Sequence, residues 1–409
     1  MLDVSRGLDT LLSPVSRDLF LKEYWEEKPL LIQRHARSFY DGLFSAHDLD
    51  QLISFSEMGF PMVRAVQKGK AEQSLNFVRD PFSPDKPLIA QIKAAYKLYA
   101  EGYTLIVNGL EWRSPPVRQL CRFLEAELNH PVGVNAYATP QGAQGFSPHF
   151  DDHDVLILQI EGIKHWVVYP PDCPLPLEEK SSGFKPLSDA QLPQPFLTAA
   201  LEAGDLLYLP RGWTHAAHAS ESASLHLTVG IFVYRWADLV QQALRNVCDK
   251  DIRFRRALPP GFLHDGLNAE SLRAHLEQLL DALKTQSDAD AARAGIARQL
   301  LKRGEPTTEG RLAEINASTE IDIETELEKP AAMRGMVIAH GAFCTFHFHG
   351  TELRLPGKTV QALTFISKQG GAFTGRQVPG PLRESEVLVL LRRLIREGFL
   401  QRTAHPTAG

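Results

Sequence analysis

The sequence predicts an α+β protein, in which an antiparallel β-sandwich or barrel precedes a helical segment and a small terminal module. Between residues 132 and 235, short apolar runs alternate with Gly/Pro turns, which is typical of antiparallel sheets. Helical periodicity follows Tyr234, and alternating strand-like patterns return after Val337. A chain of 409 residues is long enough for two or three such domains.

The region before the β-rich part mixes helical and irregular signals. We expect a helix at Ser16–Trp25 and a short strand at Lys28–Gln33, after a turn. A second helix is expected at 116–129, because apolar residues recur at helical spacing from Val117 to Leu128. The strands that follow are expected at Gly133–Tyr137, Val155–Ile160, His165–Tyr169, Asp205–Leu209 and Leu225–Val233.

Three helices are expected after the β-rich region, at Trp236–Val247, Ala269–Leu283 and Asp288–Lys302. The second helix carries a leucine stripe from Leu272 to Leu283, which either forms a dimer interface or packs on the barrel of the same chain. The polar, acidic stretch 305–330 is interpreted as a linker with some local structure.

The terminal module is expected to resemble a winged helix. Val337–Leu355 alternates in places like strands, and Val360–Lys368 and Leu382–Glu397 have helical patterns. From residue 351 to the end there are nine Lys/Arg against four Asp/Glu, a difference of +5, which makes nucleic-acid contact possible. A structural or substrate-presenting role is favoured, because the arginines of the last helix can simply face solvent.

Composition narrows the class of protein. The formal net charge of -5 does not demand a polyanionic partner. Four widely spaced cysteines, with no CxxC pair, argue against a zinc ribbon or a disulfide framework. Neither a signal-peptide pattern nor a long apolar span is evident, so we expect a soluble cytoplasmic protein without membrane contact.

The strongest chemical signal is the pair His149 and Asp151. Alternate residues of a strand project from one face, so this imidazole and this carboxylate can bind one metal together. A third ligand can come from His215, because the Pro-Arg-Gly turn after the run 205–209 can aim it back into a barrel. Two histidines and one carboxylate leave open positions on the metal, as in non-haem Fe(II) oxygenases, whereas structural zinc sites are closed.

An HxD pair is common by chance, and several of the 15 histidines compete for the third position. His153 lies two residues beyond Asp151, His218 is three residues after His215, and His226 lies on the next expected strand. His215 is preferred, with His226 lining the pocket.

With these residues in view, the chain resembles the JmjC-type ribosomal oxygenases, a branch of the cupin-fold 2-oxoglutarate oxygenases. The segments that carry the resemblance are Tyr24–Leu31, Asn135–Asp152, Leu158–Tyr169, Leu209–His215 and Ser224–Val229. The resemblance implies a double-stranded β-helix (cupin/JmjC) in 1–235, a helical dimerisation segment in 236–304, and an acidic linker with a winged-helix-like domain in 305–409. It also implies Fe(II) as cofactor and 2-oxoglutarate as cosubstrate.

The resemblance further assigns cosubstrate contacts. Lys164 matches the family's basic residue that pairs with the distal carboxylate of 2-oxoglutarate, and a dianion in an apolar barrel needs such a cation. A solvated strand lysine is the alternative interpretation. Asn135 matches a cosubstrate-contacting asparagine, Tyr137 shares its strand face, and Thr228 is expected to line the same cavity.

The implied activity is hydroxylation of a protein side chain, histidyl or arginyl, on a ribosomal protein, by a homodimer. One alternative is a cupin oxygenase that acts on a free amino acid, a peptide or another small molecule. Another is an inactive cupin whose winged helix binds nucleic acid.

Overall fold

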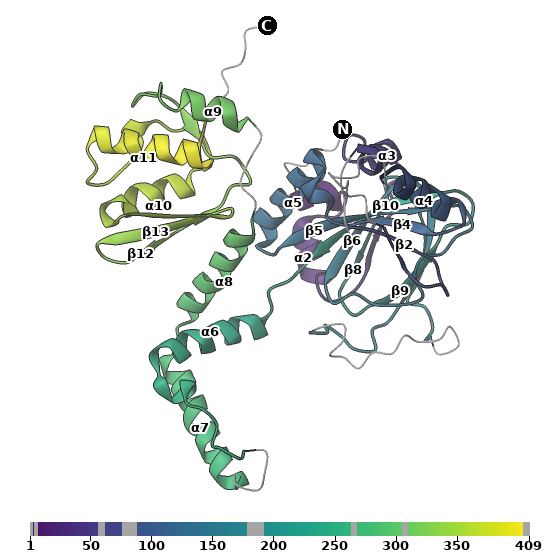
Figure 1. Ribbon diagram of the computed structural model, residues 1–409, viewed down its shortest axis with the longest axis horizontal. Helices are drawn as coiled ribbons and strands as arrows, with labels where there is room; N and C mark the ends of the chain where they lie inside the picture. The colour runs from purple at the N-terminus through teal and green to yellow at the C-terminus, as the bar shows by residue number, and fades with distance from the viewer. Residues whose placement is uncertain are drawn as a thin grey trace. The chain divides into compact units, whose positions relative to one another are not determined.

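The computed structural model describes residues 3, 7–55, 62–75, 88–177, 192–262, 268–304 and 310–403. The chain divides into two compact units, Met1–Val233 and Tyr234–Gly409, which are taken separately below (Figure 1). The three-part division expected from the sequence stays a prediction. Among the described residues, no helix combines the length and apolar character needed to span a bilayer.

The first unit is built on antiparallel strands that run in the order β1-β8-β6-β10-β5-β4-β2-β3, with β7 and β9 also paired to β6. The strands are β1 Leu30–Ile32, β2 Val63–Val66, β3 Gln73–Leu75, β4 Thr104–Val107, β5 Val132–Thr139, β6 Asp154–Tyr169, β7 Leu197–Glu202, β8 Leu206–Leu209, β9 Thr214–His218 and β10 Ser224–Ile231. The six runs expected as strands fall on β1, β5, β6, β8 and β10, and β2, β3, β4, β7 and β9 are additions.

Strand β6 links the two halves of the barrel. Its first part pairs with β8 and β10, and its second part pairs with β7 and β9. Val155–Ile160 and His165–Tyr169, expected as separate strands, are therefore one strand of 16 residues. The change of partners falls near Gly162, whose φ is +68°, and a Cβ there would lie 1.8 Å from the carbonyl oxygen of Ala223. Only glycine fits this position.

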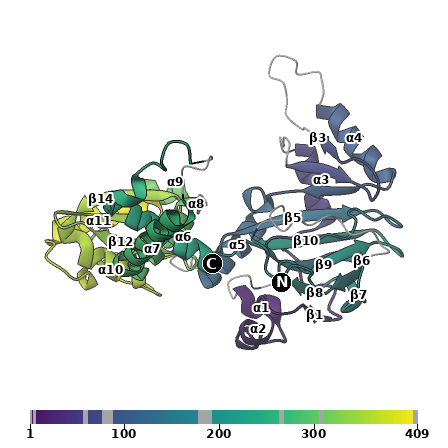
Figure 2. The same cartoon turned by 90° about the horizontal axis from the view of Figure 1, so that it is seen from below.

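Helices cover the sheet at both ends of the strand order, as Figure 2 shows, with α1 and α2 by β8 and β1, and α3 and α4 by β2 and β3. They are α1 Gly7–Leu12, α2 Arg17–Glu23, α3 Ala46–Phe55, α4 Leu88–Ala100 and α5 Pro115–Leu128. Helix α5 starts with prolines and ends at Asn129, whose left-handed φ of 56° closes the last turn. These helices bury their apolar faces on the sheet, in one continuous core.

The second unit begins with the helices α6 Trp236–Lys250, α7 Ala269–Gln286 and α8 Ala289–Arg303. Helices α6 and α8 approach closely at Gly295, where a Cβ would lie 2.7 Å from the side chain of Gln242. Helix α7 is capped by Asn268 and buries a single residue, Ala282, so its leucine stripe is largely uncovered.

The terminal module contains a three-stranded antiparallel sheet, in the order β12-β13-β14, with helices beside it. Its elements are α9 Arg311–Ala317, β11 Leu327–Glu328, β12 Gly335–Ala339, β13 Phe343–Phe348, β14 Thr351–Pro356, α10 Val360–Lys368, α11 Glu384–Glu397 and β15 Gln401–Arg402. Phe346, Phe348 and Phe399 pack against one another in its separate core. The expected strands and helices are present, and the winged-helix assignment stays a prediction.

Candidate metal and cosubstrate site

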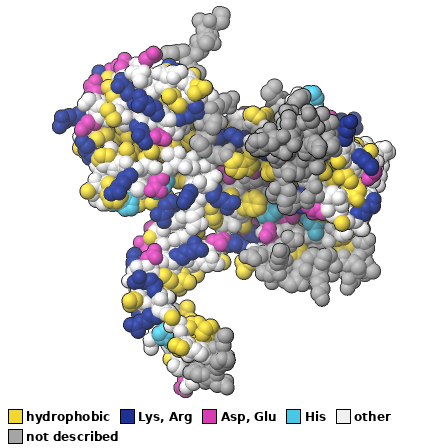
Figure 3. Space-filling model, viewed as in Figure 1, with side chains coloured by type: hydrophobic (Ala, Val, Ile, Leu, Met, Phe, Trp, Pro, Cys, Tyr) yellow, Lys and Arg dark blue, Asp and Glu magenta, His cyan; other side chains and the backbone are white. Residues whose placement is uncertain are grey.

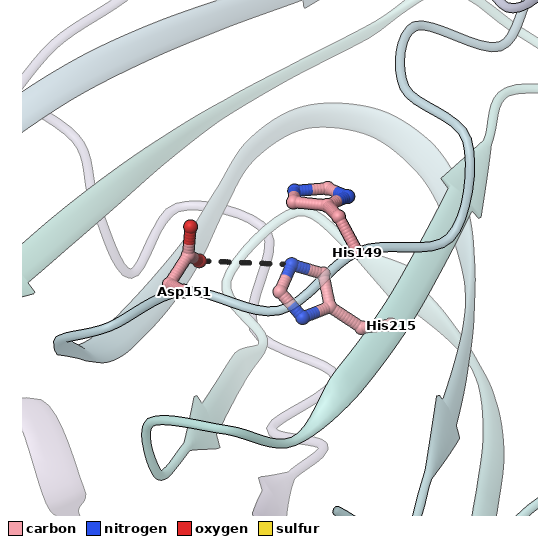
Figure 4. A group of neighbouring side chains, drawn as sticks. All are labelled: His149, Asp151 and His215. Atoms are coloured by element: carbon pink, nitrogen blue, oxygen red, sulfur yellow. Dashed lines mark ion pairs between the residues drawn. The ribbon is translucent and has the colours of Figure 1, made fainter. Parts of the chain in front are cut away.

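Three side chains of the first unit converge on one point inside the barrel. His149, Asp151 and His215 each offer a ligand atom, and these atoms all lie within 4.8 Å of one another. The Nε2 atom of His215 lies 3.7 Å from a carboxylate oxygen of Asp151, and the two imidazole centroids are 4.5 Å apart. Figure 4 shows the three side chains turned toward a common space.

Backbone hydrogen bonds bring the two histidines together. The amide of His149 donates to the carbonyl of His215 at 3.1 Å, and the amide of His215 donates back at 2.8 Å. The amide of Gly212 also donates to the carbonyl of Asp151, at 2.9 Å. The turn before His215 is therefore bonded directly to the segment that carries the other two ligands.

Each histidine is oriented through its second ring nitrogen. Nδ1 of His149 lies 2.9 Å from the carbonyl of Ser147, and Nδ1 of His215 lies 3.0 Å from the carbonyl of Trp213. A carbonyl oxygen can only accept, so Nδ1 carries the proton in both rings and Nε2 keeps its lone pair for a metal.

The electrostatics suit a metal ligand set. Burial lowers the pKa of His215 to about 4, with a further contribution from His149, so its ring is neutral near pH 7. Burial alone would raise the pKa of Asp151, but the charges of His215, His153 and His149 outweigh it and hold that pKa below its usual value. Two imidazoles and one carboxylate are the donor set that Fe(II) accepts in open, facially bound sites.

A cavity of about 550 Å³, counting its open mouth, lies against these ligands. Its walls include Tyr137, His149, Asp151, Lys164, Trp166, His215, His226 and Thr228. Lys164 is 4% exposed. Its ammonium donates to the hydroxyl of Thr139 at 2.9 Å and lies 3.4 Å from Nδ1 of His226.

Lys164 contacts no carboxylate among the described residues. Burial therefore lowers its pKa to about 7. Burial and the charge of Lys164 likewise lower the pKa of His226 well below its usual value, so His226 is neutral. A buried cation without an anion is costly. The part of the cavity beside Lys164 fits an anionic ligand.

The other expected contacts lie around this cavity in different ways. Tyr137 stacks on His226 with centroids 4.8 Å apart, and Thr228 lies in the cavity wall. Asn135 is adjacent to Tyr137 but is not among the cavity residues, and its side-chain oxygen accepts from the amide of Gly109 at 3.1 Å. Among the competing histidines, His153 bonds Asp152 at 3.1 Å, and His218 stacks on His165.

The sequence interpretation gave no role to Thr139, Thr104 and Trp166. Thr139 lies two residues beyond Tyr137 on the same strand, so extending the alternation by one step would have found it. Thr104, whose hydroxyl lies 3.1 Å from that of Thr139, reaches the site only through the pairing of β4 with β5. The sequence around Thr104 contains no pattern that would predict its place near the site.

The fold and the site define a class. A cupin-type antiparallel barrel with an inward His-Asp-His set beside a buried lysine is the arrangement of the JmjC-type oxygenases. Residues 111–239 match the JmjC domain family. Over most of its length the chain is also similar to ribosomal oxygenases.

The similar curated proteins are longer than this chain. Ribosomal oxygenase 1 of Rattus norvegicus is 35% identical over 266 residues, which are 63% of this chain and 43% of the rat protein. The bifunctional lysine-specific demethylase and histidyl-hydroxylase NO66 of Dictyostelium discoideum is 34% identical over 61% of this chain and 48% of its own length. This chain thus spans about half the length of these relatives.

A solved structure covers nearly the whole fold. YcfD, a ribosomal oxygenase from Escherichia coli in complex with cobalt and 2-oxoglutarate, aligns over 96% of this chain and 99% of its own. The TM-score is 0.55 at 17% sequence identity, so the likeness is one of fold.

Proposed function

We propose that this chain is an Fe(II)- and 2-oxoglutarate-dependent oxygenase that hydroxylates a protein side chain. The observation that carries the proposal is Lys164, a buried basic residue with no acidic partner among the described residues, in the same cavity as an open His-Asp-His set. A 2-oxo diacid satisfies both ends of this cavity, since its keto acid end chelates a metal and its distal carboxylate pairs with the ammonium.

The protein's own residues orient the reactants. His149, Asp151 and His215 would hold Fe(II), with the backbone bonds to both Nδ1 atoms keeping each Nε2 aimed at it. Lys164 and Thr139 would fix the far end of the cosubstrate, and the apolar walls at Val155 and Ile157 exclude water. When bound, Fe(II) and 2-oxoglutarate supply the dioxygen-driven oxidation of a C–H bond.

The substrate proposal rests on the relatives. Their names include ribosomal oxygenases and a histidyl-hydroxylase, and we infer that the substrate is a histidyl or arginyl residue of a ribosomal protein. The Asp-Asp pair at 151 and 152 and the lysine at 164 favour the histidyl alternative.

We also propose that the protein forms a homodimer through α7. Leu272, Leu276 and Leu280 recur at helical spacing and are 49%, 53% and 53% exposed. An uncovered apolar stripe of this length is unusual unless a partner covers it. Figure 3 shows hydrophobic side chains beside lysines and arginines on the surface formed by α6 to α8.

The terminal module is proposed to support the fold or present substrate, rather than to bind nucleic acid. Part of its positive charge is paired within the module. Lys358 lies 2.6 Å from Glu386, Arg393 lies 2.7 Å from Glu397, and Arg376 pairs with Glu324. These pairs reduce the positive charge that phosphates could bind.

The experiment is to incubate purified protein with Fe(II), 2-oxoglutarate and ribosomal proteins, and to measure succinate and the gain of one oxygen atom by mass spectrometry. His149→Ala or His215→Ala should abolish both, with a loss of more than about 100-fold, since even second-shell changes cost 10- to 100-fold. His218→Ala, three residues from His215, is the matched control. Succinate formation that survives both ligand changes would remove the proposed metal site.

A further inference from the structure

The indole of Trp166 forms part of the wall of the ligand cavity. Trp166 lies two residues beyond Lys164 on β6, so both side chains project from the same face. Its ring centroid is 5.9 Å from the ammonium of Lys164, 5.9 Å from the ring of His215 and 5.4 Å from that of His226. It therefore lies within 6 Å of the ammonium of Lys164 and of the ring of His215, one of the proposed metal ligands.

The N–H group of this indole is a buried donor without an acceptor. Trp166 is 5% exposed, and its Nε1 atom has no hydrogen-bond partner among the described residues. An indole nitrogen can only donate, and buried donors in folded proteins are almost always satisfied. Because Trp166 also forms part of the cavity wall, a bound ligand is the natural source of the missing acceptor.

A carboxylate that binds Lys164 can accept a further hydrogen bond from such a donor. A carboxylate has two oxygens with about four acceptor sites between them, and a single ammonium does not use them all. His226 is neutral and lies with Nδ1 toward the ammonium of Lys164, so it competes for the same donor instead of adding one on that side. An anion at this end of the cavity needs a further donor.

We propose that Trp166 donates its indole N–H to the distal carboxylate of bound 2-oxoglutarate, beside Lys164. This inference rests on the proposed function, and it makes Trp166 a cosubstrate-binding residue. The same contact favours diacids over 2-oxo monoacids, because only a diacid brings an acceptor to both Lys164 and Trp166.

The test substitutes Trp166 by phenylalanine, which removes the indole N–H donor and keeps an aromatic side chain. Calorimetry on Fe(II)-loaded protein, without dioxygen, measures the binding of 2-oxoglutarate and of 2-oxopentanoate, which lacks the distal carboxylate. Trp166→Phe should weaken 2-oxoglutarate binding by about 10- to 100-fold, as expected for a hydrogen bond to a charged group. It should leave 2-oxopentanoate binding and Fe(II) binding unchanged. Trp25→Phe, the same change in the apolar core, should affect neither ligand.

Two outcomes overturn the inference. One is unchanged 2-oxoglutarate binding by Trp166→Phe, and the other is an equal loss for both oxo acids, which would indicate altered packing or a contact at the metal end. If the wild-type protein does not bind 2-oxoglutarate at all, the proposed function itself fails.

A second measurement does not depend on how the variant folds. In ¹⁵N-labelled, Zn(II)-loaded wild-type protein, the indole N–H resonance of Trp166 should shift downfield with 2-oxoglutarate and not with 2-oxopentanoate. The other four tryptophans, replaced one at a time by phenylalanine, provide the assignment. A Trp166 resonance that does not respond to 2-oxoglutarate contradicts the proposal.

Discussion

Arg211 and Asp154 form an ion pair inside the first unit, with a guanidinium nitrogen 3.5 Å from the carboxylate. Asp154 is fully buried and also accepts from the backbone amide of Arg211 at 3.0 Å and from the hydroxyl of Tyr208 at 2.8 Å. Arg211 additionally pairs with Glu26, near the start of the chain. This network holds the turn that precedes His215 against the strand that follows Asp151.

Arg211→Met should destabilise the protein by about 3–5 kcal/mol, because it leaves a buried carboxylate uncompensated. It should also weaken Fe(II) binding, since the turn that carries His215 loses its anchor. Chemical denaturation and metal titration measure the two effects. The control is Arg293→Met, which breaks an exposed pair with Asp290 and should cost less than about 1 kcal/mol. Equal costs at the two sites would contradict this reading.

Lys164 predicts a pH dependence of stability in the ligand-free protein. Its pKa is about 7 in the folded state against the ordinary value of 10.5, so the unfolded state binds more protons between these pH values. The free energy of unfolding should therefore gain up to about 1.4 kcal/mol per pH unit in that window. Lys164→Met removes this contribution, so the wild-type curve minus the variant curve isolates it. A flat difference from pH 7 to 10 would show that Lys164 keeps its proton.

Gly162→Ala should be strongly destabilising, because its Cβ would overlap the carbonyl oxygen of Ala223 and its φ is positive. Gly142→Ala is a matched control, with a φ of +73° and no atom within 4 Å of the added Cβ. The control should cost only the conformational strain, about 1–2 kcal/mol. Thermal or chemical denaturation of both variants measures the difference. Similar losses would mean that β6 can shift to relieve the overlap.

If the protein dimerises through α7, disrupting the leucine stripe of that helix should halve the molecular mass of the particle in solution. Replacing Leu272, Leu276 and Leu280 together by serine should convert the dimer to a monomer, read by light scattering during size-exclusion chromatography. Leu312→Ser, at a residue that is 81% exposed elsewhere in the second unit, is the control and should keep the dimer. A monomeric wild-type protein would exclude the proposed interface.

Local patterns predicted much of the fold. The helices α5 to α8, α10 and α11 lie where helical patterns in the sequence placed them, since each pattern extends over more than two turns. Strands β2, β3, β4, β7 and β9 were missed, because runs such as Val63–Val66 are too short to show a period and are defined by their pairing partners. The continuity of β6 was missed because it also depends on a distant part of the chain. At Gly162 the strand packs against the carbonyl group of Ala223, 61 residues later, and only glycine leaves room for that contact.

In the candidate site, too, local patterns predicted some residues, whereas others depend on contacts between distant parts of the chain. Alternation related His149 to Asp151, although the two residues lie outside the named strands and only His149 forms an isolated bridge. The Pro-Arg-Gly turn favoured His215 over His218 and His226. The reciprocal backbone bonds between His149 and His215, which exist only in the folded chain, show how the turn achieves this. Lys164 came from the family resemblance, and its lack of a counter-ion required side-chain positions. The unsatisfied indole of Trp166 likewise requires the folded cavity.

The change of partners along β6 sets the length of the molecule that this protein can accept. The strand begins three residues after Asp151 and passes from β8 to β7 near Gly162, whose φ is +68°. A straight strand would separate Asp151 from Lys164 by about 40 Å, yet both residues line one cavity. The distance between the metal ligands and the ammonium therefore depends on the path of the chain at Gly162, and a backbone shift there should change which diacid fits.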